Sequence, residues 1–279
     1  MPSLPFTKMH GCGNDFVVLD CLIAVPAHRD ALASQLLDRR FGIGGDQLVS
    51  IGPGDSESDL TMTIHNADGS LVETCGNALR CVALWAQRRH LASEGSYLRI
   101  RTGAGIAIAE IRGDLVRISM GAPSLLPQAI GLSVDAPLIK SRRAFTADYA
   151  PEITCVSMGN PHCVIVVDDT ASAPVTTLGP VLEYDPLFQR RTNVEFIQPL
   201  ASDRIRMRVW ERGSGETLAC GSGACAAAVA AQLLGLVGPS CTVELPGGEL
   251  LIEWDGKADS PVMMSGPGTF VFDGVWPLA

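Results

Sequence analysis

The sequence predicts an α+β fold of two similar domains, each a curled, barrel-like mixed β-sheet around a central buried helix. Three observations favour this fold. Two helical patterns, at 73–87 and 224–234, have little polar face, as is typical of helices buried on all sides. Short β-rich runs precede and follow each of them. Landmarks in the first half also recur in the second half at a nearly constant spacing.

The repeat is clearest at two cysteines, Cys75 in ETCGNALRC and Cys220 in LACGSGAC, which lie 145 positions apart. Four further landmarks match at offsets of 145 or 146. They are Gly13-Asn14 with Gly159-Asn160, Gln47 with Asn193, Asn66 with Glu211, and ISMGAP from Ile118 with MMSGPG from Met263. Five matches in register predict a duplicated structural unit.

The domain boundaries follow from the repeat and from a proline-rich segment at 122–127. The N-terminal domain is expected to comprise 1–123, joined by the C-terminal segment 267–279, and to carry Cys75. The C-terminal domain is expected to comprise 124–266 and to carry Cys220. Both domains then have an ordinary size.

The elements of the two halves are expected in the same order. In the first half the patterns predict strands at 16–19, 47–51 and 61–66, a helix over 28–40, and a meander of strands at 97–102, 105–112 and 115–120 after the Cys75 helix. In the second half they predict strands at 153–157, 163–167, 193–198 and 204–210, the Cys220 helix, and strands at 241–245, 249–254 and 262–265. Many strands and few helices indicate an α+β class.

Charge and hydropathy exclude several classes of protein. The net charge is -9 and basic residues do not cluster, so no nucleic-acid or anionic-membrane surface is expected. No segment has the length and apolarity of a membrane span, and the N-terminus does not resemble a secretory leader. A cytoplasmic protein with a small-molecule partner is expected.

Nine cysteines allow three interpretations. A disulfide scaffold is disfavoured by the odd number and by the absence of a leader pattern, and a zinc site by the spacings of the cysteines and histidines, so no metal is expected. Free thiols remain. Most of them lie in apolar runs and are expected to be buried core residues, namely Cys21, Cys81, Cys155, Cys163, Cys225 and Cys241. Only Cys75 and Cys220, followed by Cys12, have the glycine and polar neighbours that suit chemistry.

The two helix starts predict acid–base chemistry. Unpaired N–H groups at a helix N-terminus attract anions and favour a thiolate. Two such cysteines, one on each side of an α-carbon, could remove a proton and return another on the opposite face. The helix ends could also stabilise the carboxylate of the substrate, and His162 could assist a thiol.

No cofactor is expected. Pyridoxal phosphate requires a Schiff-base lysine, and Lys8, Lys140 and Lys257 lie in no phosphate-binding context. The glycines of GIGGDQ do not match a dinucleotide fingerprint.

The motifs KMHGCGNDFVV, GIGGDQLV, HNADGSLVETCGNALRC, GNPHCV, RTNVEF and ERGSGETLACGSGACA closely resemble the signature segments of the diaminopimelate epimerases. The resemblance covers residues 8–229. It implies a cofactor-independent epimerisation of LL- to meso-diaminopimelate, an isomerase reaction in the biosynthesis of lysine and of peptidoglycan precursors. It also implies two pseudo-symmetric domains that close on the substrate, and a homodimer.

The resemblance assigns roles residue by residue. Cys75 and Cys220 are implied as the two acid/base residues, and His162 as a polar supporter of the thiols. The substrate-binding residues that it implies are Gly76, Asn77, Gly221 and Ser222 at the α-carboxylate, and Asn14, Gln47, Asn66, Asn160, Asn193, Glu211 and Arg212 around the rest of the substrate. Glu211 and Arg212 could pair with the distal ammonium and carboxylate. Cys12 departs from the pattern, which has an aliphatic residue there.

The residues alone leave other interpretations open. The asparagines also fit turns, and Glu211-Arg212 also fits a solvated pair. A proline or histidine racemase would keep both cysteines without the distal clamp, and a Cys-His hydrolase would need one thiol with His162. A non-catalytic binding protein, or an isomerase without the thiol pair, would need neither cysteine.

Overall fold

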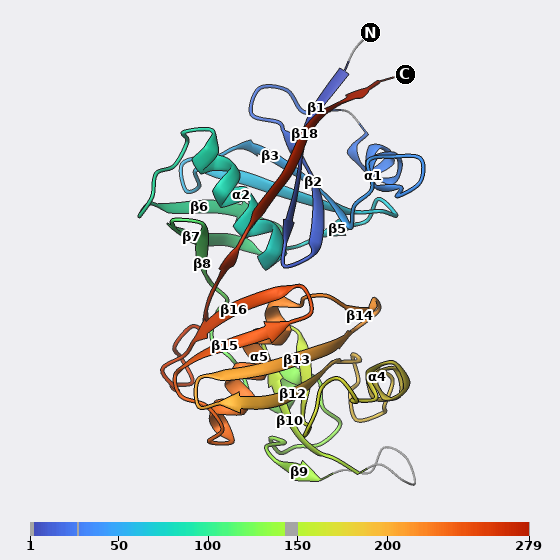
Figure 1. Cartoon of the computed structure of the whole chain (residues 1–279), viewed down its shortest axis with the longest axis vertical. Helices are drawn as coiled ribbons and strands as arrows, with labels where there is room; N and C mark the ends of the chain where they lie inside the picture. Colours follow the sequence, from blue (N-terminus) through green and yellow to red (C-terminus); the bar gives the residue numbers. More distant parts are fainter. Residues whose placement is uncertain (1–2, 27, 143–149, 279) are drawn as a thin grey trace. The chain divides into compact units, whose positions relative to one another are not determined.

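A computed structural model describes residues 3–26, 28–142 and 150–278, and it has the predicted α+β class with mixed β-sheets. The chain forms two compact units, Met1–Ile118 with Ser265–Ala279 and Ser119–Met264 (Figure 1). Among the described residues, no helix combines the length and apolarity that a membrane span requires.

The first unit is a mixed sheet that curls around one helix. Pairing joins its strands in the order β18, β1, β2, β3, β4, β6, β7, β8, with β5 beside β4. Their bounds are β1 (Ser3–Gly11), β2 (Asn14–Asp20), β3 (Gln47–Pro53), β4 (Leu60–Asn66), β5 (Leu71–Val72), β6 (Tyr97–Thr102), β7 (Gly105–Arg112), β8 (Leu115–Ser119) and β18 (Thr269–Pro277). The helices are α1 (Arg29–Leu37) and α2 (Gly76–Arg88).

Helix α2 is the centre of this unit, as predicted. Every residue from 77 to 86 is buried, and Trp85 is among the largest buried side chains. The helix packs against β1 and β7, so the curled sheet covers it from more than one side (Figure 1). Because 77–86 leaves no face for water, the residues there are apolar except Asn77 and Arg80, which hydrogen-bond to each other.

The second unit repeats this plan. Pairing joins its strands in the order β9, β10, β11, β12, β13, β15, β16, with β14 beside β13. Their bounds are β9 (Ser141–Arg142), β10 (Glu152–Ser157), β11 (Pro161–Val166), β12 (Asn193–Ala201), β13 (Arg204–Glu211), β14 (Gly215–Thr217), β15 (Ser240–Leu245) and β16 (Gly248–Glu253). The remaining elements are α3 (Pro127–Ile130), α4 (Val175–Glu183), α5 (Gly221–Leu233) and β17 (Met263–Pro267). Residues 223–231 of α5 are all buried.

Strand register confirms the internal repeat. Strands β2 and β3 are parallel and place Phe16 opposite Gln47, while β11 and β12 are parallel and place His162 opposite Asn193. In each unit the next strand is antiparallel and the one after the helix returns parallel to it. The two units therefore share one order of pairing.

Several elements differ from the expectation. The first helix ends at Leu37 and not at 40, because Asp38 Oδ1 accepts the backbone N–H groups of Arg40 and Phe41 and so starts a turn. Strands β1 and β18 were not predicted, although they pair along their length, from Ser3 with Pro277 to His10 with Thr269. Prolines in both segments weaken the strand signal.

Helix α4 was also missed. It contains Gly179 and Pro180, two residues that lower helix propensity. Gly179 is required by packing, since a Cβ at this position would lie 2.5 Å from Trp210 Cγ. Tertiary contact outweighs the local propensity here.

Candidate functional site

The first half of the candidate site lies at the start of α2. Cys75 is the N-cap residue, with extended backbone (φ -147°, ψ 117°), and its carbonyl accepts the N–H of Leu79. Gly76 and Asn77 begin the helix, where backbone N–H groups have no intrahelical acceptor. A partly exposed sulfur thus lies beside the positive end of the helix, as predicted.

Two predicted asparagines contact each other at this helix start. The Cys75 Sγ donates to Asn14 Oδ1 at 3.7 Å, and Asn77 Nδ2 donates to the same oxygen at 3.3 Å. Asn14 begins β2 after a tight turn in which Cys12 and Gly13 both have positive φ. The turn folds the β1–β2 hairpin back so that the asparagine amide meets the cysteine.

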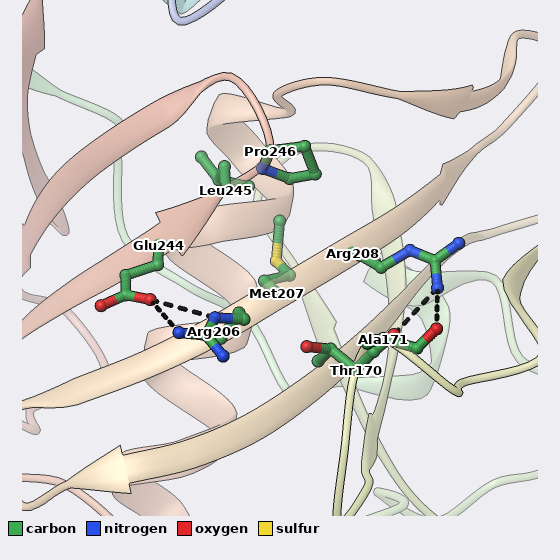
Figure 2. A pocket seen from close by; sticks show the side chains of 8 residues that line it. All are labelled: Thr170, Ala171, Arg206, Met207, Arg208, Glu244, Leu245 and Pro246. Carbon is green, nitrogen blue, oxygen red and sulfur yellow. Dashed lines mark hydrogen bonds and ion pairs between the residues drawn. The ribbon is translucent and has the colours of Figure 1, made fainter.

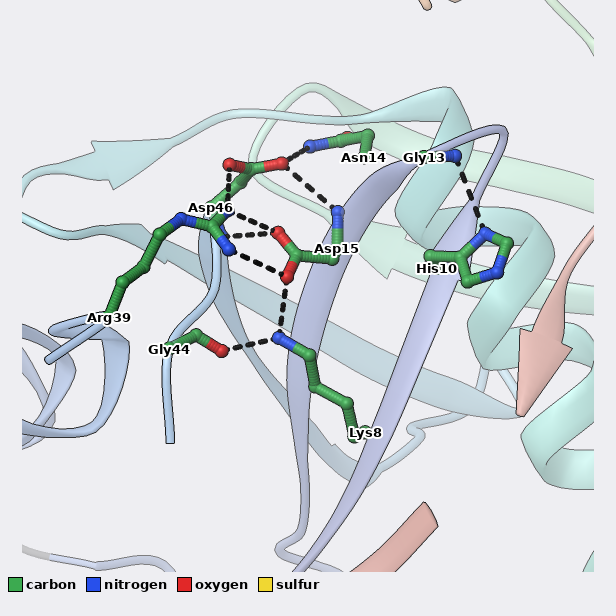
Figure 3. Close-up of polar contacts among 8 residues, drawn as sticks. All are labelled: Lys8, His10, Gly13, Asn14, Asp15, Arg39, Gly44 and Asp46. Carbon is green, nitrogen blue, oxygen red and sulfur yellow. Dashed lines mark hydrogen bonds and ion pairs between the residues drawn. The ribbon is translucent and has the colours of Figure 1, made fainter. Parts of the chain in front are cut away.

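Charged residues that the sequence interpretation missed surround these asparagines (Figure 3). Asn14 Nδ2 donates to Asp46 Oδ2 at 2.9 Å, and Asp46 pairs with Arg39 at 2.8 Å. On the other side, the fully buried Arg80 donates to Asn77 Oδ1 at 2.8 Å.

Asp15 stabilises the same corner of the first unit (Figure 3). Lys8 Nζ donates to Asp15 Oδ2 at 2.7 Å and to the carbonyl of Gly44, and Arg39 pairs with Asp15 Oδ1 at 2.7 Å. Burial alone would raise the pKa of Asp15, but the hydrogen bonds from Arg39 and Lys8 outweigh it and lower the pKa from 3.8 to about 2.

We expect Asp15→Asn to lower the free energy of unfolding at neutral pH by about 2 kcal/mol, the equivalent of that shift. A depressed pKa stabilises the folded state above the unfolded value of 3.8, and this contribution is lost as the pH falls through about 2. The free energy of unfolding, measured in urea between neutral pH and pH 2, should therefore fall less with decreasing pH in the variant than in the parent protein. The solvent-exposed Asp114→Asn serves as the control, and equal acid sensitivity of Asp15→Asn and the parent protein would contradict the expectation.

Gln47 and Asn66 lie opposite each other on β3 and β4. Gln47 Nε2 donates to Asn66 Oδ1 at 3.1 Å, and Asn66 Nδ2 donates to Ser70 Oγ at 3.1 Å. The side-chain oxygen Oε1 of Gln47 is buried, and no described residue donates a hydrogen bond to it. A buried acceptor without a donor is costly in a folded protein, so this oxygen is available to a ligand.

The second half of the candidate site lies at the start of α5. Cys220 is the N-cap residue, and its sulfur accepts the backbone N–H of Gly223 at 3.3 Å. Ser222 Oγ lies 3.7 Å from the same sulfur. Gly221 and Ser222 begin the helix, as Gly76 and Asn77 do in the first unit.

A chain of polar side chains leads from this cysteine into the core. Asn160 Nδ2 donates to Ser222 Oγ at 3.3 Å, and Asn160 Oδ1 lies 3.0 Å from His162 Nε2. His162 Nδ1 in turn lies 2.7 Å from Glu195 Oε1, and both side chains are fully buried. The structure thus brings three predicted residues together and adds Glu195.

The electrostatics of this half-site disfavour negative charge. Burial raises the pKa of Cys220 well above its usual value, the charges of Glu211 and Glu195 raise it further, and the hydrogen bonds from Ser222 and Gly223 oppose them. Burial likewise raises the pKa of Glu195, against the opposing effect of His162. A ligand that carries a cationic group would therefore lower the cost of ionising the sulfur.

Three further predicted residues belong to the second unit. Asn193 Nδ2 donates to the carbonyl of Pro161 at 2.9 Å, and its Oδ1 accepts the backbone N–H of Arg212 at 2.9 Å. At the start of β12, the Asn193 side chain therefore links the backbone of Pro161 to that of Arg212. Glu211 accepts a hydrogen bond from Thr217 Oγ1, and the exposed Arg212 donates to the carbonyl of Arg190 at 3.1 Å.

The remaining cysteines have structural positions. All nine are free thiols, and those expected in the core are buried: Cys21, Cys81, Cys155, Cys163, Cys225 and Cys241. Cys12 is buried as well, 3.6 Å from Arg80. In the described part of the chain, no three His, Cys, Asp or Glu side chains cluster as metal ligands would.

A hollow of about 270 Å³ in the second unit does not involve these residues (Figure 2). Its charged groups already have partners, because Arg206 pairs with Glu244 and Arg208 donates to the carbonyls of Thr170 and Ala171. The hollow therefore offers a ligand no unsatisfied charge.

The sequence did contain signals for two of the missed residues. Glu195 interrupts the apolar strand run NVEFI, and Arg80 interrupts the apolar helix. A charge at a position expected to be buried indicates a paired group with a specific role. Asp46 gave no such signal, because an aspartate in a glycine-rich loop is common.

Comparison with known proteins gives consistent results. The family model described as diaminopimelate epimerase matches residues 6–126 and 154–271. The chain is similar to diaminopimelate epimerases from Microcystis aeruginosa (45% identity, 99% of this chain and 100% of the relative) and Moorella thermoacetica (47%, 98% and 99%). It is also similar to the enzyme of that name from Methanococcus maripaludis (41%, 97% and 99%).

Solved structures share the fold at low sequence identity. A phenazine biosynthesis protein of the PhzF family from Bacillus anthracis matches with a TM-score of 0.71 and 13% identity over the whole of both chains. A hydroxyproline epimerase from Agrobacterium vitis matches with a TM-score of 0.69 and 15% identity, over 98% of this chain and 92% of that one.

Proposed function

The chain belongs to the diaminopimelate epimerase family, and we propose that it interconverts LL- and meso-diaminopimelate by a two-base thiol mechanism without a cofactor. The reaction is an isomerisation in the biosynthesis of lysine and of peptidoglycan precursors. The observation that carries the proposal is the duplicated half-site, since each unit presents one cysteine as the N-cap of its central helix.

Cys75 and Cys220 act as the acid/base pair. One sulfur removes the α-proton as a thiolate while the other donates a proton as a thiol, and the roles exchange in the reverse reaction. The contacts of the two sulfurs support this division, because that of Cys75 donates to Asn14 whereas that of Cys220 accepts from Gly223. His162, linked to Cys220 through Asn160 and Ser222, supports the second thiol.

The substrate α-carboxylate binds the backbone N–H groups at the starts of α2 and α5, contributed by Gly76 and Asn77 and by Gly221 and Ser222. These groups lack intrahelical acceptors and carry the positive ends of the helix dipoles. Negative charge that develops on the carboxylate as the α-proton leaves is stabilised there. Asn14 and Asn160 orient the substrate, and Asn193 contributes by holding the backbone of Arg212.

The distal amino-acid group of the substrate binds Glu211 and Arg212. Gln47 and Asn66 are further proposed substrate-binding residues, contributed by the first unit. Carboxylate–ammonium and guanidinium–carboxylate pairs are charge-assisted and directional. Glu211 also raises the pKa of Cys220, so its neutralisation by the substrate ammonium would make that thiol easier to ionise. The clamp would thus distinguish diaminopimelate from substrates with a single amino-acid group.

We expect Arg212→Ala to raise the KM for LL-diaminopimelate about 10- to 100-fold, the loss of one hydrogen-bonded charge contact. A smaller change in kcat is expected, because the contact is made equally in the ground state and the transition state. Arg204→Ala removes another arginine from the same unit, paired with Glu244 and Glu249, and should leave KM unchanged. An unchanged KM in Arg212→Ala would exclude the distal clamp and favour a substrate without a second amino-acid group.

The protein is also proposed to be a cytoplasmic homodimer. Nine free thiols, two of them required as thiols for the reaction, suit a reducing compartment. The proposal of a homodimer is based on the family alone. Sedimentation equilibrium of the purified protein tests it, and a monomeric mass at micromolar concentration would contradict it.

A further inference from the structure

We propose that Asp46 and Arg80 are positioning residues for Cys75. Acting through two amide side chains, they direct an acceptor oxygen at the sulfur and so hold its proton in the free enzyme. The inference rests on the proposed function, because it assigns a role to residues that touch neither the substrate nor the reacting carbon.

The first anchor is a carboxylate. Asn14 Nδ2 donates to Asp46 Oδ2 at 2.9 Å, and a carboxylate can only accept hydrogen bonds. The amide nitrogen of Asn14 must therefore face Asp46, and its oxygen must face the opposite way (Figure 3). Arg39 holds Asp46 from the other side at 2.8 Å.

The second anchor is a guanidinium. Arg80 donates to Asn77 Oδ1 at 2.8 Å, and a guanidinium can only donate. The amide nitrogen of Asn77 must therefore point away from Arg80, and it donates to Asn14 Oδ1 at 3.3 Å. The chain of hydrogen bonds thus has one direction, from a buried cation through two amides to an anion.

Packing keeps the cationic end of this chain in place. Arg80 is fully buried and also donates to the carbonyl of Pro267 at 2.9 Å. Gly11 leaves room for it, since a Cβ there would lie 3.0 Å from Arg80 NH2 and 3.1 Å from Asn77 Cβ. If the Asn14 amide were flipped, its oxygen would face the carboxylate of Asp46. If the Asn77 amide were flipped, its NH₂ group would face the guanidinium of Arg80. Both contacts are unfavourable, so the orientation of the two amides is fixed.

The consequence falls on Cys75. Its sulfur lies 3.7 Å from Asn14 Oδ1, which offers only lone pairs, so the sulfur must be the donor and must carry its proton. A thiolate at this position would lose the hydrogen bond, and its negative charge would face the lone pairs of Asn14 Oδ1. Cys220 differs, since its sulfur accepts the N–H of Gly223 and lies beside a serine hydroxyl.

Other charged and titratable groups lie in the same corner of the first unit. Arg80 donates to Cys12, a buried thiol whose pKa burial raises. Burial also raises the pKa of Cys81, Arg80 opposes this, and the charges of Cys75 and Cys12 add to it. The titratable and charged groups of this corner come from α2, the β1–β2 hairpin and the loop before β3. They are Arg80, Cys81, Lys8, His10, Cys12, Asp15, Arg39 and Asp46. The Asn14 oxygen is the acceptor whose orientation Asp46 and Arg80 set, through the hydrogen bonds of Asn14 and Asn77.

The test is the pH dependence of Cys75 alkylation in the full-length protein. Iodoacetamide labelling, read at the Cys75 peptide by mass spectrometry, gives a rate profile whose midpoint reports ionisation of this thiol. In Asp46→Ala the Asn14 amide loses one anchor, and we expect the midpoint to move about 0.7 pH unit lower, the equivalent of a fivefold weaker hold on the proton. The plateau rate at high pH should not change, because the accessibility of the sulfur is the same.

Two further variants control the experiment. Asp46→Asn keeps an acceptor oxygen for Asn14 and should restore most of the parent midpoint. Asp59→Ala removes a comparable aspartate, which accepts the backbone N–H of Arg99 at 2.8 Å and pairs with its guanidinium at 2.8 Å, and should change neither midpoint nor plateau.

An unchanged midpoint in Asp46→Ala would overturn the positioning role, as would a higher plateau with no shift, which indicates greater exposure of the sulfur. The result is independent of turnover. A protein that does not epimerise diaminopimelate but shows the shift would contradict the proposed function alone, whereas normal turnover without the shift would contradict the positioning role alone.

Discussion

Replacement of either Cys75 or Cys220 by serine should lower the turnover of LL-diaminopimelate by about 10³-fold, within the range that one positioned acid or base contributes. A hydroxyl has nearly the size of a thiol but is a far weaker acid, so it can neither supply the base nor donate the proton at neutral pH. Since the proposed mechanism uses each of the two groups once per turnover, the loss should be similar for the two variants and in both directions of the reaction.

A third cysteine provides the matched control. Cys241 is a buried thiol of the second unit whose Sγ donates to the carbonyl of Thr242 at 3.7 Å, and a serine there keeps a donor. Cys241→Ser should therefore retain turnover. Full epimerase activity in one of the two site variants would contradict the two-base scheme, because the remaining thiol would then suffice for the reaction.

Gly223→Ala should lower kcat by about 10²-fold, the cost of displacing a catalytic atom by about 1 Å. A Cβ at this position would lie 2.9 Å from Glu195 Oε1, 3.1 Å from Cys220 Sγ and 3.2 Å from Cys220 Cβ. Neither neighbour can move freely, because Glu195 is buried against His162 and the sulfur accepts the N–H of Gly223 itself.

The direction of the change in stability of Gly223→Ala is informative. Alanine is the better helix former by about 1 kcal/mol, so it would stabilise the protein if its Cβ met no obstruction. Gly238→Ala is the control in the same unit, because its Cβ would meet only the Ser202 carbonyl, at 3.9 Å. Steady-state kinetics and thermal unfolding of both variants check the expectation. Parental kcat in Gly223→Ala would show that the helix start is not packed against the reacting sulfur.

Much of the fold was predictable because it is duplicated. The mostly apolar sequences of α2 and α5 identify buried helices, and two such helices with matched flanking landmarks identify a repeated unit. Elements outside the repeat signal were harder to predict. Strand β18 has only exposed or half-buried residues. Helix α4 contains Pro180 and Gly179, and packing against Trp210 requires the glycine.

The candidate site was predictable where a residue type is unusual for its context. Cysteines at glycine-rich helix starts and paired asparagines are such cases. The polar residues behind them were missed because their role depends on contacts between distant segments, as between Asp46 and Asn14 or between Glu195 and His162. Spacing within one segment carries no information about such contacts.

The most direct test of the central claim is solvent isotope incorporation during early turnover of LL-diaminopimelate by the purified protein in deuterium oxide, without added cofactor. If two different thiols remove and return the proton, the meso product carries deuterium at the inverted carbon while the remaining LL substrate stays unlabelled. Equal labelling of substrate and product from the start, or a product without deuterium, would contradict a two-base mechanism.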